Sequence, residues 1–301
     1  MFLTHMKILL TGASGNLGSA VCRKLHEDGF EVVATDQIMK KDLPVRLKVA
    51  DLRDRIVCYE LMEGADAIVH LAAHPNDGYP IKQELLNDNT SFTMNLLHAA
   101  YESGIRKFLF ASSIQAMVRM RRIGEDGTIP QSRLKYLPAD GEVPADPDNV
   151  YGLSKQLCEQ MLKFYAQEKG MSCIAFRFPF LYNPEFLKFY RRYHISWKAY
   201  MNQQGNLEEC FASLSVNDAA RLIAAVLRKD LPVYRCYFPA IPNPIADEEV
   251  SVLLDKYYKG VELRKPVSEI KSLVDISRIT GDTGWTPEDN VLQMLKDAIK
   301  V

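Results

Sequence analysis

The stretch KILLTGASGNLGSAVCRKL, residues 7–25, decides the fold of this chain. Its apolar start predicts a strand, its end has the pattern of a helix, and glycines stand between them at positions 12, 15 and 18. In such a loop the first glycine permits a tight turn, the second lets the backbone approach a pyrophosphate, and the third lets the helix pack close to the strand. The helix N-terminus offers free N–H groups and a partial positive charge to phosphates. We therefore expect a dinucleotide at this loop; the alternative is a tight turn without a ligand.

An acidic residue at the end of the second expected strand indicates which dinucleotide is bound. Asp36 ends the run EVVATD, 24 residues after Gly12. A carboxylate there accepts hydrogen bonds from ribose hydroxyls and repels a 2′-phosphate, which favours NAD over NADP. Lys40 and Lys41 lie close by and weaken that preference. Asp51, which ends the third expected strand, has two interpretations: a contact with the adenine edge, or the N-cap of the following helix.

Composition and charge narrow the class of protein. The chain has 301 residues, 47% hydrophobic and 25% charged, with a net charge of −1. The near-neutral charge argues against nucleic-acid binding, and no apolar run reaches the ~18 residues that span a bilayer. The six cysteines form no CxxC pair and the histidines do not cluster. We therefore expect reduced thiols in a cytoplasmic protein, with no disulfide framework and no metal site.

Strand and helix patterns alternate through the first half of the chain. This order predicts an α/β fold with a doubly wound parallel sheet of the Rossmann type, because strands covered on both faces are short apolar runs. The alternation is lost after about residue 178, so we expect residues 1–177 to form the NAD-binding domain and residues 178–301 mainly to bind substrate. An amphipathic helix over 216–229 predicts that residues 211–230 pack back on the first domain. Strands are expected at 7–11, 31–36, 47–51, 67–73, 107–113 and 172–178, and helices at 16–28, 53–63, 84–103 and 149–169.

Three polar side chains are placed by the pattern to act on one bound group. Tyr151 and Lys155, in the segment YGLSK, are one helical turn apart and share a face. A tyrosine is a poor base at neutral pH because its pKa is ~10, and a neighbouring ammonium favours the phenolate. Ser113 ends the fifth expected strand, at the carboxyl edge of the sheet where open α/β folds bind ligands. The YxxxK pattern alone is common on surface helices, but after the glycine loop it indicates an active site.

Several segments in this order resemble the extended short-chain dehydrogenases/reductases, with their sugar-nucleotide epimerases and dehydratases. The resemblance covers nearly the whole chain. The order and spacing of the segments carry it, rather than any single motif. The segments are TGASGNLG (11–18), HLAA (70–73), NTSFTMNLLHAA (89–100), FASS (110–113), YGLSK (151–155) and VND (216–218).

The resemblance implies a role for each residue of the site. Tyr151 is the catalytic acid/base, and Lys155 holds the nicotinamide ribose while lowering the pKa of the tyrosine. Ser113 binds the reacting hydroxyl, and Asn89 supports the site from the neighbouring helix. The resemblance also implies a homodimer formed through the helices at 84–103 and 149–169. The residues expected to bind NAD are Gly12, Gly15, Asn16, Leu17, Gly18, Asp36, Asp51, Leu52, Leu71, Ala72, Ala73 and Lys155.

Departures from the pattern of the family narrow the substrate. Ser113 is followed by Ile-Gln-Ala rather than by the acidic pair of the dehydratases, which disfavours dehydration. Phe180 stands where enzymes of nucleotide sugars have an asparagine, and Glu208 and Glu209 stand where an arginine usually precedes V-x-D. Both differences weaken the case for a nucleotide sugar. The residues expected to contact the substrate are His74, Ser112, Gln115, Arg119 and Phe180.

The basic segment 118–136 has two interpretations. It is a solvated loop, or one of Arg119, Arg121 and Arg122 binds an anionic group of the substrate, since arginine offers a bidentate fork to carboxylate or phosphate. The second interpretation is similar to the uronate dehydrogenases, which oxidise free sugar acids.

Two classes of function remain open. The first is an NAD-dependent oxidoreductase or epimerase that transfers hydride at a secondary hydroxyl of a sugar or sugar nucleotide. The second is a regulator that binds the dinucleotide without catalysis. Such regulators usually lose the tyrosine–lysine pair, which this chain keeps. The sequence leaves open the sugar, the carbon oxidised, the direction of the reaction and the oligomeric state.

Overall fold

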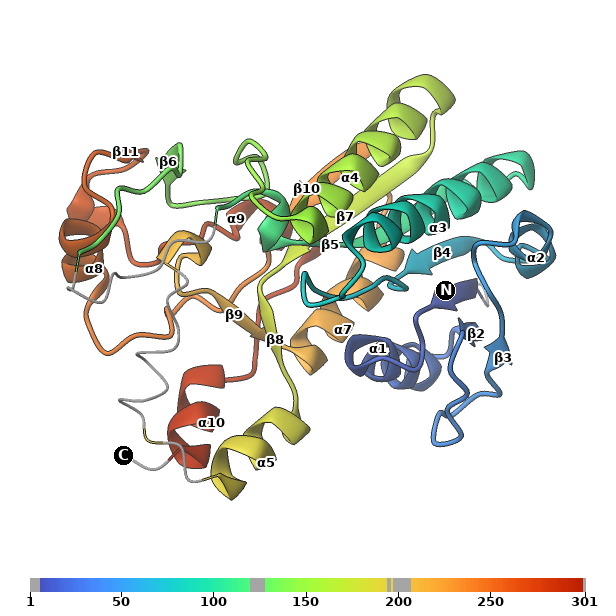
Figure 1. The fold of residues 1–301 in the computed structure, drawn as a ribbon, viewed down its shortest axis with the longest axis horizontal. Coiled ribbons are helices and arrows are strands. Elements are labelled where there is room, and N and C mark those ends of the chain that lie inside the picture. The colour runs from blue at the N-terminus through green and yellow to red at the C-terminus, as the bar shows by residue number, and fades with distance from the viewer. Residues whose placement is uncertain (1–5, 120–127, 194–195, 197–206, 300–301) are drawn as a thin grey trace.

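A seven-stranded sheet forms the centre of the molecule in a computed structural model that describes residues 6–119, 128–193, 196 and 207–299 (Figure 1). Its strands are all parallel, in the order β10-β7-β5-β4-β1-β2-β3. The chain therefore runs outward on both sides of the β1–β4 boundary, where doubly wound sheets leave a crevice for ligands. The strands are β1 (Lys7–Thr11), β2 (Glu31–Asp36), β3 (Lys48–Val49), β4 (Ala67–His70), β5 (Lys107–Ser113), β7 (Ser172–Phe178) and β10 (Tyr234–Tyr237).

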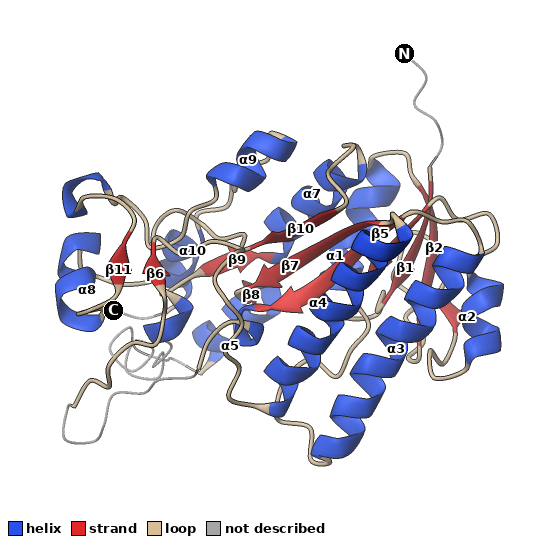
Figure 2. Ribbon diagram, turned by 90° about the horizontal axis from the view of Figure 1, so that it is seen from above, coloured by secondary structure: helices blue, strands red, loops and turns tan. Residues whose placement is uncertain are grey.

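Helices cover both faces of this sheet (Figure 2). Successive side chains of a strand point to opposite faces, so Leu10 and Val69 belong to one buried cluster and Leu9 and Ile68 to the other. Two layers of apolar packing thus hold the strands rigidly between them. The first cluster is closed by α1 (Asn16–Glu27) and α7 (Val216–Leu227), and the second by α2 (Arg55–Leu61), α3 (Lys82–Glu102) and α4 (Val150–Lys169).

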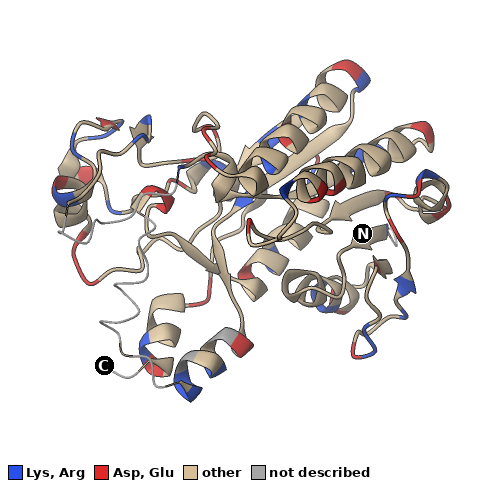
Figure 3. Ribbon diagram, viewed as in Figure 1, with Lys and Arg blue, Asp and Glu red and all other residues tan. Residues whose placement is uncertain are grey.

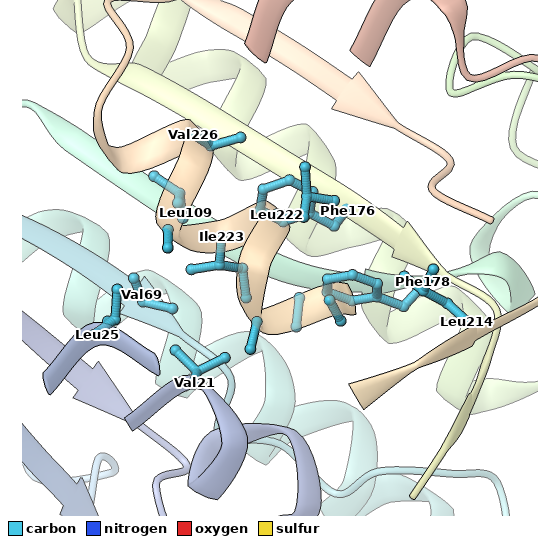
Figure 4. Close-up of a cluster of buried hydrophobic side chains, with 14 of the residues drawn as sticks. Val21, Leu25, Val69, Leu109, Phe176, Phe178, Leu214, Leu222, Ile223 and Val226 are labelled. Atoms are coloured by element: carbon cyan, nitrogen blue, oxygen red, sulfur yellow. The ribbon is translucent and has the colours of Figure 1, made fainter. Parts of the chain in front are cut away.

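Helix α7 comes from the C-terminal part of the sequence but packs beside α1 on the sheet (Figure 4). Val21 and Leu25 of α1 lie in one buried cluster with Leu222, Ile223 and Val226 of α7. The spacing of these side chains is that of one helical face, so each helix buries a single apolar stripe. Residues 216–227 therefore belong to the layer that covers the sheet.

The edge strand β10 extends the sheet by a strand that the sequence analysis does not predict. It pairs in parallel with β7, with Tyr234 opposite Cys173 and Tyr237 opposite Phe176. Its sequence YRCY is only partly buried, because it lies at the edge of the sheet. A short strand with an arginine lacks the continuous apolar run that marks the central strands.

A third buried cluster lies beyond the sheet, in the part of the molecule that holds α8 (Figure 1). It contains β6 (Tyr136–Leu137), which pairs with β11 (Glu262–Leu263). A second short pair, β8 (Phe180–Tyr182) with β9 (Ser213–Ser215), instead packs into the first cluster through Tyr182 and Leu214. The remaining elements are η1 (Ile114–Ala116), α5 (Pro184–Arg192), η2 (Leu207–Glu209), α8 (Val250–Tyr257), η3 (Val267–Glu269), α9 (Ser277–Thr283) and α10 (Val291–Ala298).

The expected α/β Rossmann-type fold is confirmed, and the strands that were predicted differ from the observed ones in where they end. The fourth strand ends at His70 rather than at residue 73, and the third is only Lys48–Val49. Residues 71–73 leave the sheet and line the cleft described below. Propensity sets the type of an element, whereas the point at which its pairing stops depends on its neighbours.

The motif VND anchors the end of the chain to α7. Asp218 is fully buried, and its carboxylate accepts the backbone N–H groups of Glu288 at 2.8 Å and Asp289 at 3.0 Å. The indole of Trp285 donates to the Asp218 carbonyl at 3.1 Å. The conspicuous aspartate of this motif therefore has a structural task.

Charges of both signs are distributed over the helices and loops (Figure 3). This mixture agrees with the net charge of −1 of the whole sequence. Among the helices of the described residues, none is both long and apolar enough to cross a membrane.

Candidate active site

A cleft of about 890 Å³ opens at the carboxyl ends of β1, β2, β4, β5 and β7. It lies where the strand order diverges, the position at which open α/β sheets bind ligands. Most of the predicted site residues line it, whereas Asp51, Asn89 and Arg119 do not. Those that line it are Gly12, Gly15, Asn16, Leu17, Gly18, Asp36, Leu52, Leu71, Ala72, Ala73, His74, Ser112, Ser113, Gln115, Tyr151, Lys155 and Phe180.

Protein packing requires two of the three glycines in the loop between β1 and α1. Gly12 has φ +71, and a Cβ there would lie 2.6 Å from the nitrogen of Ala72. A Cβ at Gly18 would lie 2.0 Å from the carbonyl oxygen of Gly12, because the helix packs directly on the turn. Any side chain at either position would have to displace backbone atoms.

Packing does not require the remaining glycine, Gly15, which fits a ligand instead. A Cβ at Gly15 would meet only the Gly12 oxygen, at 3.4 Å. Gly15 is also the N-cap of α1, and a glycine has no side chain to cap the N–H groups of the first turn. The space beside Gly15 therefore admits a pyrophosphate, with helical N–H groups to bind it.

The carboxylate of Asp36 lies beside this loop. It accepts the backbone N–H of Ser14 at 3.0 Å and that of Ile38 at 3.1 Å, and all three residues line the cleft. This places an acceptor where the adenosine ribose hydroxyls of a dinucleotide are bound. The ammonium of Lys40 donates to the Ser19 hydroxyl at 2.8 Å, so it is held against α1. The glycine loop and Asp36 together fit a dinucleotide without a 2′-phosphate.

The N-cap interpretation of Asp51 is wrong. The N-cap of α2 is Asp54, whose carboxylate accepts the backbone N–H of Ile56 at 2.8 Å. Asp51 instead forms an ion pair with Arg53 at 2.6 Å, and the hydrogen bond from that guanidinium lowers the pKa of Asp51 to about 2. The neighbouring Leu52 lines the cleft with an apolar side chain.

Helix α4 and strand β5 bring the three side chains predicted to react together. Tyr151 and Lys155 lie on the first turns of α4, and Ser113 is the last residue of β5. The Ser113 hydroxyl lies near enough to the phenol of Tyr151 to lower its pKa. The Lys155 ammonium donates to the carbonyl oxygen of Ala111 at 2.8 Å and lies 5.7 Å from the centre of the Tyr151 ring. All three reactive residues are buried yet line the cleft.

Burial has the largest effect on the pKa values of Tyr151 and Lys155. This differs from the expectation that Lys155 lowers the pKa of the tyrosine. Burial raises the pKa of Tyr151 to about 12, although the hydrogen bond from Ser113 lowers it. Burial lowers the pKa of Lys155 to about 8. The ammonium is thus less firmly charged than an exposed lysine, and the phenol is protonated at neutral pH.

Close packing of α4 fixes the position of Tyr151. A Cβ at Gly152 would lie 2.2 Å from the carbonyl oxygen of Gln115, so α4 approaches η1 more closely than any side chain allows. Asn149 caps the helix by accepting the N–H of Gly152 at 2.8 Å, and its amide donates to the Gln115 side chain at 3.2 Å. Gln115, a predicted substrate contact, therefore also holds the start of α4, which carries Tyr151 and Lys155.

Asn89 lies behind the cleft wall rather than on it. Its side chain accepts the backbone N–H of His74 at 2.8 Å and donates to the carbonyl of that residue at 3.3 Å. The ring of His74 is paired with Asp88 at 2.9 Å and lies 4.1 Å from the ring of Tyr79, centre to centre. Asn89 thus holds the segment that follows β4 in place along the cleft.

A buried ion pair supports the floor of the site. Glu159, one turn after Lys155 on α4, is paired with Arg177 of β7 at 2.7 Å. The hydroxyl of Ser112 donates to the same carboxylate at 2.6 Å. Ser112 lines the cleft as expected, but its hydroxyl is committed to joining β5 to α4.

The arginine expected to bind an anionic substrate is engaged elsewhere. Arg119 is paired with Asp146 at 3.1 Å, and so is Arg133. Arg121 and Arg122 lie outside the described residues.

The sequence analysis did not predict several of the residues that line the cleft. Ser14 lies inside the glycine loop, so the loop itself was a sufficient signal for it. Glu209 and Phe178 lie near the end of the alternating pattern or beyond it, where no periodicity marks them. The missed residues include Ser14, Gln37, Asn76, Phe178, Glu209 and Val216.

The fold and the cleft define a dinucleotide-binding α/β protein with a serine, a tyrosine and a lysine at the carboxyl edge of its sheet. The sequence profile of the NAD dependent epimerase/dehydratase family matches residues 8–235, and the chain belongs to this family. The family is one of enzymes, and its cofactor is NAD.

Named relatives carry related sugar chemistry. The chain is 29% identical over 188 residues to GDP-mannose 3,5-epimerase of Arabidopsis thaliana, covering 60% of this chain and 48% of that protein. It is 31% identical over 180 residues to L-arabinose 1-dehydrogenase (NAD(P)(+)) of Haloferax volcanii, covering 58% and 67%. The chain thus spans about half the length of the GDP-mannose 3,5-epimerase.

A solved structure has the same fold over nearly the whole chain. Uronate dehydrogenase from Agrobacterium tumefaciens, complexed with NAD, superposes with a TM-score of 0.66 at 20% identity, covering 98% of this chain and 91% of the other. At this identity the likeness concerns the fold.

Proposed function

We propose that this protein is an NAD-dependent oxidoreductase or epimerase that acts on a secondary hydroxyl of a sugar or sugar nucleotide. The observation that carries the proposal is that Ser113, Tyr151 and Lys155 line the same cleft as the glycine loop and Asp36. A dinucleotide held by the loop and a hydroxyl held by the serine and tyrosine would therefore meet. The sugar chemistry of the epimerase and dehydrogenase relatives supports the substrate class.

Tyr151 moves the proton of the reacting hydroxyl, and bound NAD supplies the hydride acceptor. Ser113, whose hydroxyl is near enough to the phenol to lower its pKa, fixes the substrate oxygen beside it. Because the pKa of Tyr151 is about 12, the phenol is an acid at neutral pH, and oxidation of an alcohol needs a second group to accept the proton. Lys155, the neighbour on α4, has a pKa of about 8, so the fraction of it that is a neutral amine can accept that proton, whereas the charged ammonium cannot.

The two alternatives have less support. Oxidation of a free sugar acid, as in uronate dehydrogenases, would use a cation for the carboxylate, but Arg119 is paired with Asp146 away from the cleft wall. A non-catalytic sensor of dinucleotide would have no need of the buried tyrosine–lysine pair.

We infer a homodimer formed through α3 and α4, which pack side by side (Figure 1). The supporting observation is a set of exposed apolar side chains on these helices: Met94 on α3, and Leu153, Leu157 and Phe164 on α4. Those of α4 fall on one helical face. Sedimentation should give twice the chain mass of 34.2 kDa, and Leu157→Glu with Phe164→Glu should give the mass of one chain.

We also place the protein in the cytoplasm. All six cysteines are free, and five of them are buried, as expected in a reducing compartment.

Replacing Tyr151 by phenylalanine tests the proposed chemistry. The variant Tyr151→Phe should lose turnover with aldoses, uronic acids and UDP-, GDP- and dTDP-sugars while it still binds NAD. Tyr165→Phe is the matched control, because Tyr165 is a buried tyrosine of the same helix that does not line the cleft. Its hydroxyl lies 3.3 Å from Nδ1 of His98. Unchanged turnover in Tyr151→Phe would refute the proposal.

A further inference from the structure

The loop between β4 and α3 forms one wall of the cleft and also reaches the helix that carries Tyr151. Residues 73–76 of this loop line the cleft. The next residue, Asp77, does not line it, but its carboxylate accepts the backbone N–H of Tyr151 at 3.2 Å. This bond spans 74 positions of the sequence. It joins a wall of the cleft directly to the backbone of the residue proposed to move the proton.

A tight turn and an ion pair fix Asp77 in this position. The side chain of Asn76 accepts the backbone N–H of Gly78 at 2.8 Å, which closes the turn. Lys82, the first residue of α3, pairs with the Asp77 carboxylate at 2.9 Å and also donates to the Asp77 backbone carbonyl. The carboxylate therefore bridges the N-terminal ends of α3 and α4, which pack side by side (Figure 1).

The loop is held at a second point, nearer to β4. Asn89 binds both the backbone N–H and the backbone carbonyl of His74. The ring of His74 also packs on that of Tyr79, with 4.1 Å between the ring centres. The loop is thus attached on both sides of the cleft-lining residues 75 and 76. Because it is fixed in this way, it can hold the start of α4 in turn.

Tyr151 lies in a part of α4 that needs such support. It is the second residue of the helix, and the N–H groups of a first helical turn have no partner within the helix. Helix ends fray for this reason. Asn149 accepts the N–H of Gly152 at 2.8 Å, and Asp77 accepts that of Tyr151. Two carbonyl or carboxylate acceptors therefore hold the turn from which the phenol projects.

The carboxylate of Asp77 is also charged at neutral pH. Burial alone would raise the pKa of Asp77, but the hydrogen bonds from Lys82 and from the Tyr151 N–H hold it below its usual value. A hydrogen bond to a charged acceptor is stronger than one to a neutral acceptor. A negative charge at this end of a helix also interacts favourably with the helix dipole.

We propose that Asp77 is a positioning residue for the reaction. By accepting the N–H of Tyr151 it holds the first turn of α4, and with it the phenol, beside Ser113. The inference rests on the proposed proton transfer by Tyr151 and deepens it. It assigns the position of the phenol in part to a loop that belongs neither to α4 nor to the sheet.

Kinetics with NAD and the panel of aldoses, uronic acids and UDP-, GDP- and dTDP-sugars test the inference. Asp77→Ala removes the acceptor, and kcat should fall about tenfold or more, because a small displacement of a reacting group slows a reaction strongly. The Kd for NAD should change little, because the glycine loop and Asp36 lie on other strands. Asp77→Asn retains an oxygen that can accept the bond, so it should keep about half of kcat or more.

Glu84→Ala is the matched control. Glu84 is an exposed carboxylate of the first turn of α3, and it accepts a hydrogen bond from Tyr79 of the same loop at 3.1 Å. Within the described residues it makes no hydrogen bond to α4. Its loss should therefore change kcat by about twofold or less, as is usual for surface substitutions.

Amide hydrogen exchange, followed by NMR, gives a measurement that does not depend on turnover. In Asp77→Ala the N–H of Tyr151 should exchange about tenfold faster or more, because the first turn of α4 opens more often. The amides of the central strand β5 should exchange as before, which separates local opening from loss of overall stability. The Asp77 side chain is 36% exposed, so its removal leaves no deeply buried group without a partner.

Four results would overturn the inference. These are an unchanged kcat in Asp77→Ala, an equal loss of kcat in Glu84→Ala, an Asp77→Asn variant as slow as Asp77→Ala, and an unchanged exchange rate at Tyr151. The two measurements also separate this inference from the proposed function. Faster exchange in Asp77→Ala of a protein that turns over no sugar would refute the function alone. Equal turnover by Asp77→Ala and the unsubstituted protein would refute the inference alone.

Discussion

The side-chain amide of Asn89 donates a hydrogen bond to the hydroxyl of Ser154 at 3.0 Å, and this bond joins α3 to α4. Ser154 in turn donates to the carbonyl oxygen of Tyr151 at 2.7 Å and precedes Lys155 in the sequence. The same amide group binds the backbone of His74. One buried asparagine thus sets the start of the catalytic helix relative to the opposite cleft wall, which makes it a positioning residue.

Replacing Asn89 by alanine should therefore slow catalysis more than it weakens cofactor binding. The variant leaves polar groups of His74 and Ser154 without their partner, at a cost of roughly 1–3 kcal/mol in the free energy of unfolding. We expect kcat to fall while the Kd for NAD changes little. Thr90→Ala is the control, because its hydroxyl bonds to the Leu86 carbonyl of its own helix. A rise in the Kd for NAD with unchanged kcat would contradict the positioning role.

Adding a methyl group to each of two glycines should separate cofactor binding from stability. In Gly15→Ala the added methyl group would lie 3.4 Å from the Gly12 oxygen, so the variant should fold normally. It should bind NAD more weakly, because the methyl group occupies the space beside the pyrophosphate. Gly18→Ala would place its methyl group 2.0 Å from the Gly12 oxygen and should destabilise the fold. Urea unfolding and NAD titration check both variants. Equal NAD affinity in Gly15→Ala and the unsubstituted protein would count against a pyrophosphate at this position.

The buried ion pair between Glu159 and Arg177 should matter far more than a surface pair. Glu159→Ala leaves the Arg177 guanidinium buried without its partner, which typically costs about 3–5 kcal/mol of unfolding free energy. Glu185 and Lys188 form an exposed pair, so Glu185→Ala should cost about 1 kcal/mol or less. Urea unfolding of both variants gives the comparison. Similar losses in the two would show that the buried pair does not support the sheet.

Glu209 should make stability fall as the pH rises towards neutrality. Burial raises the pKa of its carboxyl from 4.5 to about 7. Between these values the folded protein binds more protons than the unfolded chain, so the free energy of unfolding decreases with increasing pH. Unfolding in urea at several pH values from about 4.5 to about 7 should show a larger loss for the unsubstituted protein than for Glu209→Gln. Parallel curves would indicate that this carboxyl is not desolvated.

Local patterns predicted the sheet and one side of the cleft well. Short apolar runs identified six of the strands, because central parallel strands are covered on both faces. The glycine loop, Asp36 and the pair Tyr151 and Lys155 were found because the function expected of them needs fixed spacings within one turn or one helix. The edge strand β10 was missed because its half-buried sequence lacks such a run.

Contacts between distant parts of the chain could not be predicted in this way. Arg119 was expected at the substrate, but its guanidinium pairs with Asp146. Ser112 was expected to contact the substrate, but its hydroxyl binds Glu159, 47 residues away in the sequence. The partner of a side chain depends on which elements pack together, and the periodicity of a single segment does not predict which other elements pack against it.

The sequence by itself determined the strand–glycine loop–helix start of the fold, the carboxylate for the ribose, and a tyrosine and a lysine on one helical face. Each follows from the short-range geometry of the backbone, which neighbouring residues control. The tertiary structure alone decided that burial raises the pKa of Tyr151 and that Glu209 reaches the same cleft. Desolvation and electrostatic proximity arise only when segments far apart in the chain are packed against one another.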